Sequence, residues 1–113
     1  MTKIKIFKID GFITGFECSG HTGYGEYGSD ILCATISALS QSCALGIKKV
    51  LNLNAHIEKK DKVGYMKIEL PSKTNHEDII RAQVLFVTFE QSIVDLLEEY
   101  SDYISMEVIE NVY

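Results

Sequence analysis

The chain opens with isoleucine alternating with lysine, which predicts a strand over residues 3–9. Asp10 and Gly11 follow, a pair typical of a two-residue hairpin turn because glycine readily adopts the positive φ that such a turn requires. Alternation resumes over residues 12–18, so the first 18 residues are predicted to form a β-hairpin. One face of its second strand is expected to carry Phe12, Thr14, Phe16 and Cys18.

A glycine-rich loop over residues 19–29 separates this hairpin from a segment in which apolar residues recur every three or four positions. That spacing predicts an amphipathic helix, with Ser29 or Asp30 as its cap, running to about Leu51. The stripe that it is expected to bury comprises Leu32, Ile36, Leu39, Cys43, Ile47 and Val50.

A second helix is predicted to start at a capping box, in which Thr74 caps the helix and Glu77 reaches back, and to run to about Tyr100. It is apolar on two sides, which indicates more burial than a surface helix usually has. We therefore expect its second stripe to contact another copy of the chain. The first stripe comprises Ala82, Phe86, Phe89, Ile93, Leu96 and Tyr100, and the second Ile80, Val84, Val87, Val94 and Leu97.

Three further strands are predicted, two of them forming a second hairpin over residues 53–59 and 63–70 and the last covering 104–109. The resulting order, ββαββαβ, predicts the α+β class: a two-layer α/β sandwich with a mixed β-sheet and two long helices. No linker or low-complexity segment interrupts it, so residues 1–113 are expected to form a single domain.

The 113 residues are enough to bury roughly two thirds of the unfolded surface, so the fold needs no disulfide or metal. No stretch approaches the ~20 apolar residues of a membrane span, and the first ten residues lack the apolar run of a signal peptide. We therefore expect a cytoplasmic protein. Its net charge of −5 suits a basic partner, and direct nucleic-acid binding is not expected.

The candidate chemistry lies between Gly20 and Ser37. His21 follows a predicted strand, and Cys33 falls in the first turn of the predicted helix. Free amides and aligned peptide dipoles favour negative charge there, and a thiolate with a neighbouring imidazole is the minimum for nucleophilic catalysis by cysteine. The same amides are candidates to bind the oxyanion of a tetrahedral intermediate.

Two other polar residues lie on the same side of the helix as Cys33. Asp30 is expected either to cap the helix or to orient His21, and Ser37 either to hydrogen-bond behind the thiol or simply to pack. The alternative for the pair itself is structural: Cys33 is then a small core residue, as free cysteines usually are, and His21 an ordinary loop residue. Cys18 and Cys43 are expected in the core, and neither His56 nor His76 has a partner at metal-ligand spacing.

Gly23, Gly25 and Gly28 match the spacing G-x-G-x-x-G between a strand and a helix, which is also the context of a phosphate-binding loop. Glu26 and Asp30 would then face the phosphates, and the preceding strand belongs to a hairpin. The pattern therefore favours this reading less than the cysteine–histidine one, but a phosphate-loop binding module stays an alternative.

The sequence also resembles the ribosomal-processing cysteine proteases (Prp) over nearly its whole length. The resemblance is carried by the glycine-histidine, glycine, aspartate and cysteine-alanine pattern of that family. Thr22 stands where alanine is common, and Thr35 replaces a second alanine; we expect neither to touch the chemistry. The matching residues are Gly20, His21, Gly23, Tyr24, Gly28, Asp30, Cys33, Ala34 and Ser37.

The resemblance implies a homodimeric cytoplasmic endopeptidase without metal or cofactor. It implies Cys33 as nucleophile, His21 as general base and acid, and Gly20, Asp30 and Ser37 as supporting residues. The implied substrate is the precursor of large-subunit ribosomal protein twenty-seven, a basic protein, cut after an aromatic pair and before a small residue. A non-catalytic ribosome-assembly factor on the same fold is the alternative. The substrate-gating loop would contain Gly23, Tyr24, Gly25, Tyr27 and Gly28.

Overall fold

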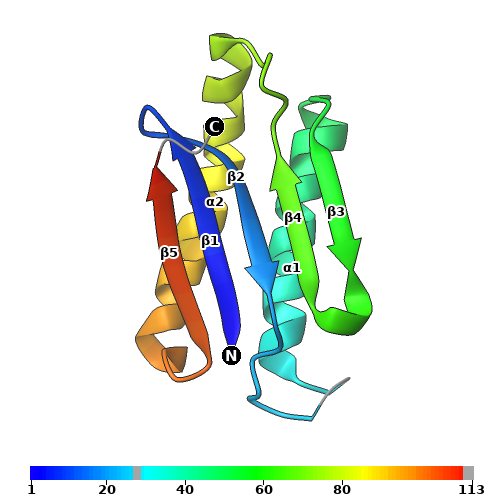
Figure 1. Cartoon of the computed structure of the whole chain (residues 1–113), viewed down its shortest axis with the longest axis vertical. Coiled ribbons are helices and arrows are strands. Elements are labelled where there is room, and N and C mark those ends of the chain that lie inside the picture. Colours follow the sequence, from blue (N-terminus) through cyan, green and yellow to red (C-terminus); the bar gives the residue numbers. More distant parts are fainter. Residues whose placement is uncertain (27–28, 111–113) are drawn as a thin grey trace.

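The computed structural model describes residues 1–26 and 29–110, and within them five strands form one sheet with two long helices packed on one face (Figure 1). The two-layer α+β class and the order ββαββαβ agree with the sequence-based prediction. The strands are β1 (Thr2–Ile9), β2 (Phe12–Ser19), β3 (His56–Lys60), β4 (Tyr65–Glu69) and β5 (Ile104–Glu110), and the helices are α1 (Ile31–Leu45) and α2 (His76–Tyr100).

The strands are arranged in the order β3-β4-β2-β1-β5. β5 runs parallel to β1, and the other pairs are antiparallel, so the sheet is mixed. Asp10 and Gly11 both have positive φ, 51° and 84°, as the predicted tight turn between β1 and β2 requires. The hairpin therefore forms where the sequence placed it.

A bulge in β2 reverses the predicted faces of its first residues. Phe7 pairs with Gly15 and Lys8 with Ile13, so Thr14 is an extra residue opposite β1. One extra residue inverts the alternation, and Ile13, only 1% exposed, lies in the core instead of Thr14. Beyond the bulge the prediction holds, because Phe16 and Cys18 are buried.

The first helix continues past α1 as a π-helical turn, η1 (Gly46–Val50), and ends near the predicted residue. A π turn holds more residues than an α turn, so the helical phase shifts, and Val50 is 75% exposed although the stripe predicted it buried. Gly46 permits close packing on α2, because a Cβ there would lie 2.6 Å from Leu85 Cδ1. Buried members of the predicted stripe are Leu32, Ile36, Cys43 and Ile47.

The same helix corrects the expectation about membrane spans. By length and composition alone, the 20 residues from Ile31 to Val50 would suffice to cross a membrane. In the fold this segment is a core helix, with Ile36 and Ile47 buried, and core helices of folded domains pass the same test. The segment is therefore only weak evidence for a membrane location.

The second helix starts one residue later than predicted. Asn75 is its cap and accepts a 2.9 Å hydrogen bond from the Asp78 amide, whereas the Thr74 hydroxyl donates to the Pro71 carbonyl. The predicted capping box is therefore wrong by one position. Gln83 of this helix bonds both backbone groups of Ile13 at the bulge, each at 2.8 Å, and so ties α2 to β2.

The two apolar stripes of α2 have different surroundings. The first stripe packs on the sheet, with Ala82, Phe86, Phe89 and Ile93 buried, and Phe16 stacks on Phe89. In the second stripe Ile80, Val84 and Val87 are exposed in the single chain, Val84 by 71%, whereas Leu97 packs against the core. Part of the apolar surface of α2 is therefore exposed in the single chain, and its predicted contact with another copy of the chain stays a prediction.

The second predicted hairpin is shorter than expected. Leu53 and Ala55 are buried but unpaired in the sheet, because the Leu53 amide bonds back to the Ile47 carbonyl and the Ala55 amide to the Leu53 carbonyl. β3 therefore starts only at His56. A short 3-10 turn, η2 (Asp61–Val63), and Gly64 join β3 to β4 at the end of the sheet near the start of α1 (Figure 1).

Candidate active site

Asp30 fixes the point at which the loop after β2 becomes α1. Its Oδ1 accepts hydrogen bonds of 2.9 Å from both the Leu32 and Cys33 amides, so Asp30 is the cap of the helix. Its Oδ2 accepts from the Thr22 hydroxyl at 2.6 Å and the Gly25 amide at 3.0 Å. One buried carboxylate therefore holds both the first turn of α1 and the start of the glycine loop.

The same contacts keep Asp30 ionised. Removal of the carboxylate from water raises its pKa, but hydrogen bonds from Thr22, Cys33, Gly25 and Leu32 together outweigh that effect and lower the pKa to about 2. Asp30 is therefore a fixed negative charge at any pH near neutrality.

Cys33 lies in the first turn of α1, and its sulfur is held by Thr22. The Thr22 amide donates to Cys33 Sγ at 3.3 Å, and the Thr22 hydroxyl oxygen lies 3.5 Å from the same sulfur. Thr22 is only 2% exposed, so these contacts are shielded from water. This corrects the expectation that Thr22 does not touch the chemistry.

The helix-terminal amides do not form the oxyanion site that the sequence suggested. The Leu32 and Cys33 amides are engaged by the Asp30 side chain, and the Ala34 amide donates to the Asp30 carbonyl at 3.1 Å. The amide that points at the sulfur is instead that of Thr22.

His21 lies beside Gly64, across the cavity from α1. A Cβ on Gly64 would lie 2.9 Å from His21 Cε1 and 2.8 Å from the Gly20 carbonyl oxygen, so only glycine leaves room for the ring. Gly20 itself has a φ of 90° and passes close to the Met1 carbonyl, which excludes a side chain there too. Glycines from two segments thus set the position of the imidazole.

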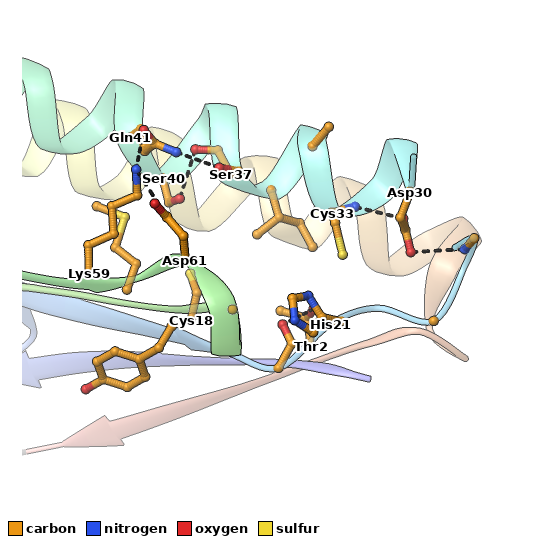
Figure 2. A pocket seen from close by; sticks show the side chains of 18 residues that line it. Thr2, Cys18, His21, Asp30, Cys33, Ser37, Ser40, Gln41, Lys59 and Asp61 are labelled. Atoms are coloured by element: carbon orange, nitrogen blue, oxygen red, sulfur yellow. Dashed lines mark hydrogen bonds and ion pairs between the residues drawn. The ribbon is translucent and has the colours of Figure 1, made fainter. Parts of the chain in front are cut away.

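Cys33 and His21 line the same cavity, which has a volume of about 440 Å³. Figure 2 shows the sulfur on the side of α1 that faces His21, with Thr2 next to the ring. The floor of the cavity is apolar and includes Ile36 and Met66. The cavity therefore places a thiol and an imidazole at one end of a hollow large enough for peptide side chains.

Polar residues close the far end of this cavity. Lys59 Nζ donates to Gln41 Oε1 at 3.1 Å and lies 3.4 Å from Asp61 Oδ1, which joins α1 to the β3–β4 turn (Figure 2). Gln41 in turn donates to the Ser37 hydroxyl. Ser37 therefore lines the cavity, but its hydroxyl bonds to Gln41 along the helix. The hydrogen bond behind the thiol that the sequence offered as one alternative is not formed by this contact.

Tyr24 packs away from the cavity. Its ring makes edge contacts with Tyr100 and Tyr103, at centroid distances of 5.6 and 5.2 Å, at the end of α2. Tyr24 thus anchors the described part of the glycine loop, whereas Gly23 and Gly25 line the cavity. The other two residues of the predicted gating loop, Tyr27 and Gly28, lie outside the described residues.

The remaining cysteines are unsuited to catalysis. Cys18 and Cys43 are buried, as predicted, and burial raises the pKa of each thiol to about 12. The described residues contain no cluster of three potential metal ligands. A phosphate is disfavoured at the start of α1, because the ionised Asp30 already occupies its amides.

Comparison with known proteins decides the family. The family model described as "Cysteine protease Prp" matches residues 1–105. A protein named ribosomal processing cysteine protease Prp from Staphylococcus aureus (strain NCTC 8325 / PS 47) is 30% identical over 97 residues, which are 86% of this chain and 88% of that protein. The chain belongs to the Prp cysteine protease family. As a Prp-family protein it is an enzyme that hydrolyses peptide bonds.

Two solved structures, one of them a Prp protease, share the fold of this chain. Streptococcus mutans SMU.848 superposes with a TM-score of 0.85 and 29% identity, covering 98% of this chain and 96% of its own. The S. aureus Prp protease in complex with a covalently linked product peptide gives 0.84 and 29%, covering 96% and 100%. The Prp fold of this chain is therefore shared with a relative that binds a peptide covalently.

Sequence reasoning missed two residues of the site. Gly64 lies in another hairpin, more than forty positions along the chain from His21, and no local pattern connects them. Thr22 departs from the Prp pattern, although its hydroxyl is next to the candidate histidine in the sequence. Both contacts depend on how the loop folds back onto α1 and the β3–β4 turn.

Proposed function

We propose that this Prp-family enzyme cleaves peptides with Cys33 as nucleophile and His21 as general base and acid. The main support for this proposal is that both side chains line one cavity at the start of α1, where the Thr22 amide donates a hydrogen bond to the Cys33 sulfur. Gly20 and Asp30 support the pair by fixing His21 and the start of the helix, and Ser37 lines the cavity beyond it.

In the proposed reaction His21 takes the thiol proton, and the Cys33 sulfur attacks the carbonyl carbon of the scissile peptide bond. The protonated His21 then gives its proton to the departing amine, which leaves a thioester between Cys33 and the acyl part of the substrate. His21 next removes a proton from water, and the resulting hydroxide attacks the thioester. The carboxylic acid product departs and Cys33 regains its proton, so no metal or cofactor enters the cycle.

The proposed substrate is the precursor of large-subunit ribosomal protein twenty-seven, in the cytoplasm, cut after an aromatic pair at the end of its N-terminal extension. The apolar floor of the 440 Å³ cavity fits large apolar side chains next to the scissile bond. The net charge of −5 favours approach of a basic ribosomal protein. The glycine loop is proposed to move when the peptide enters, with Gly23 and Gly25 lining its path.

Thiol reactivity and cleavage test this proposal together. At pH 7 iodoacetamide is expected to label Cys33 at least about tenfold faster than Cys18 or Cys43, which are buried. A peptide spanning the extension junction is expected to be cut, and to be spared once Cys33 is labelled. Mass spectrometry follows both events, with a peptide lacking the aromatic pair as control. Unimpaired cleavage by the labelled enzyme would contradict the assignment of Cys33.

We also propose that the enzyme works as a homodimer through the second stripe of α2, where Ile80, Val84 and Val87 are exposed. Val84→Glu is expected to raise the dimer dissociation constant at least about a hundredfold, because burying a carboxylate against apolar groups costs several kcal/mol. Sedimentation equilibrium measures the change. Val63→Glu, at an exposed valine in the β3–β4 turn, serves as control. A monomeric wild type, or a dimeric Val84→Glu variant, contradicts the interface.

A further inference from the structure

Thr22 is the point at which the nucleophile, the helix cap and the glycine loop meet. Its hydroxyl donates to Asp30 Oδ2 at 2.6 Å, accepts from the Tyr24 amide at 3.2 Å and lies 3.5 Å from Cys33 Sγ. Its amide donates to the same sulfur. Since the residue is 2% exposed, water does not compete for these contacts. A buried hydroxyl thus lies in contact with both a carboxylate and a thiol.

The Thr22 hydroxyl has a single hydrogen, and this limits which hydrogen bonds it can donate when Cys33 is protonated and when it is ionised. A threonine hydroxyl has one hydrogen to donate, and in the structure that hydrogen goes to Asp30. The Thr22 oxygen therefore acts as an acceptor for the Cys33 S–H while the thiol is protonated. Once the thiol is ionised, the sulfur needs donors instead, and the same oxygen would face it with lone pairs unless the hydrogen turned.

We propose that Thr22 is a positioning residue whose hydroxyl hydrogen turns from Asp30 to Cys33 Sγ when the thiol loses its proton. This inference rests on the proposed role of Cys33 and His21. The proton itself passes from sulfur to His21, and Thr22 only rotates, so it neither gains nor loses a proton.

Asp30 tolerates the change because it keeps three other hydrogen bonds, from the Gly25, Leu32 and Cys33 amides. The thiolate gains a second donor besides the Thr22 amide. Without the hydroxyl, the ionised sulfur would keep the Thr22 amide but lack this second donor while it lies near the Asp30 carboxylate, and charge repulsion would oppose the thiolate. The Thr22 hydroxyl thus allows the Cys33 thiolate to form beside the Asp30 carboxylate at the N-terminus of α1.

Valine and serine at this position separate the hydroxyl from the shape of the side chain. Thr22→Val is expected to slow alkylation of Cys33 by iodoacetamide at pH 7 about tenfold and to lower kcat by a similar factor, because a hydrogen bond to a charged group is lost. KM is expected to change less than about twofold, because the cavity wall keeps its shape. Thr22→Ser is expected to restore both rates to within about threefold of wild type.

The buried thiols report whether each variant keeps its fold. Cys18 and Cys43 must stay protected from iodoacetamide, and Thr22→Ala replaces Thr22→Val if they do not. Thr74→Val is the matched control. It removes a threonine hydroxyl just before the start of α2, outside the cavity lining, and is expected to keep wild-type rates. Wild-type alkylation in a folded variant without the hydroxyl overturns the role of Thr22, as does a Thr22→Ser enzyme as slow as Thr22→Val. A wild type that fails to cleave the peptide contradicts the proposed function instead.

Discussion

Replacing Cys33 with serine is expected to lower kcat/KM for the junction peptide by about 10⁴ or more, because an alcohol beside a single imidazole is a far weaker nucleophile than a thiolate. His21→Ala is expected to cost about 10³ or more, since no other described residue of the cavity lining is a ready proton acceptor: Asp61 is paired with Lys59 at 3.4 Å. The cavity otherwise contains Asp30 and Asp61 as carboxylates, and Asp30 is already occupied by four hydrogen bonds.

The double variant distinguishes a catalytic pair from two residues that act separately. If the thiol and the imidazole work as one unit, Cys33→Ser with His21→Ala loses scarcely more activity than Cys33→Ser alone. Independent roles would instead multiply the two losses. Single-turnover assays at high enzyme concentration measure residual rates of this size.

Matched controls lie elsewhere in the chain. Cys43→Ser replaces a buried thiol on the same helix, and His56→Ala an exposed histidine in β3. Both are expected to keep cleavage, although Cys43→Ser loses some stability because a buried polar group is introduced. Persistent cleavage in a purified Cys33→Ser protein would exclude this sulfur as the nucleophile.

The fold was predictable because its signals are local. The Asp10-Gly11 turn and the three-and-four spacing of apolar residues in α1 depend only on neighbouring positions, and both appear where expected. The errors in the predicted buried faces arise where an irregularity in the backbone shifts the periodicity of a strand or helix. The bulge at Thr14 exchanged the faces of β2, and the π turn at Gly46–Val50 exposed Val50. Both irregularities contact α2, through Gln83 and Leu85, and such contacts between distant segments are not part of the local pattern.

The candidate site was predictable in its two chemical groups and in Asp30 as a helix cap. His21 and Cys33 stand out because imidazole and thiol around a glycine loop suggest nucleophilic chemistry. Their surroundings depend on contacts between distant segments: Gly64 against His21, and Lys59 across to Gln41. Tyr24 is a further example: the resemblance placed it in the substrate-gating loop, and no local pattern indicated that its ring packs on Tyr100 and Tyr103.

Loss of the Asp30 carboxylate is expected to have the largest effect on stability among the site residues. Asp30→Ala removes the helix cap and leaves four donors without their acceptor, so we expect a loss of about 3 kcal/mol in the free energy of unfolding. Asn75→Ala removes the exposed cap of α2, which accepts one hydrogen bond, and should cost about 1 kcal/mol. Urea denaturation at pH 7 gives both values.

Asparagine at position 30 distinguishes the role of Oδ1, which caps the helix, from that of Oδ2, which holds the glycine loop. Asparagine is a good helix cap, so its carbonyl oxygen replaces Oδ1 toward the Leu32 and Cys33 amides. Its amino group then occupies the place of Oδ2, where the Thr22 hydroxyl and the Gly25 amide both donate, and donors face donors. We therefore expect Asp30→Asn to lose about 2 kcal/mol, between wild type and Asp30→Ala.

The contribution of the Asp30 charge to the free energy of unfolding is expected to depend on pH. The folded pKa of Asp30 is about 2, below its ordinary value of 3.8, so between these values the unfolded chain binds more protons than the folded one. The stabilisation by the carboxylate is therefore complete above about pH 5 and is lost as the pH falls toward 2. The stability difference between wild type and Asp30→Asn should accordingly be constant from pH 7 to 5 and shrink at pH 3. Equal differences at pH 3 and pH 7 would show that the charge of Asp30 does not contribute, and that its role is hydrogen bonding alone.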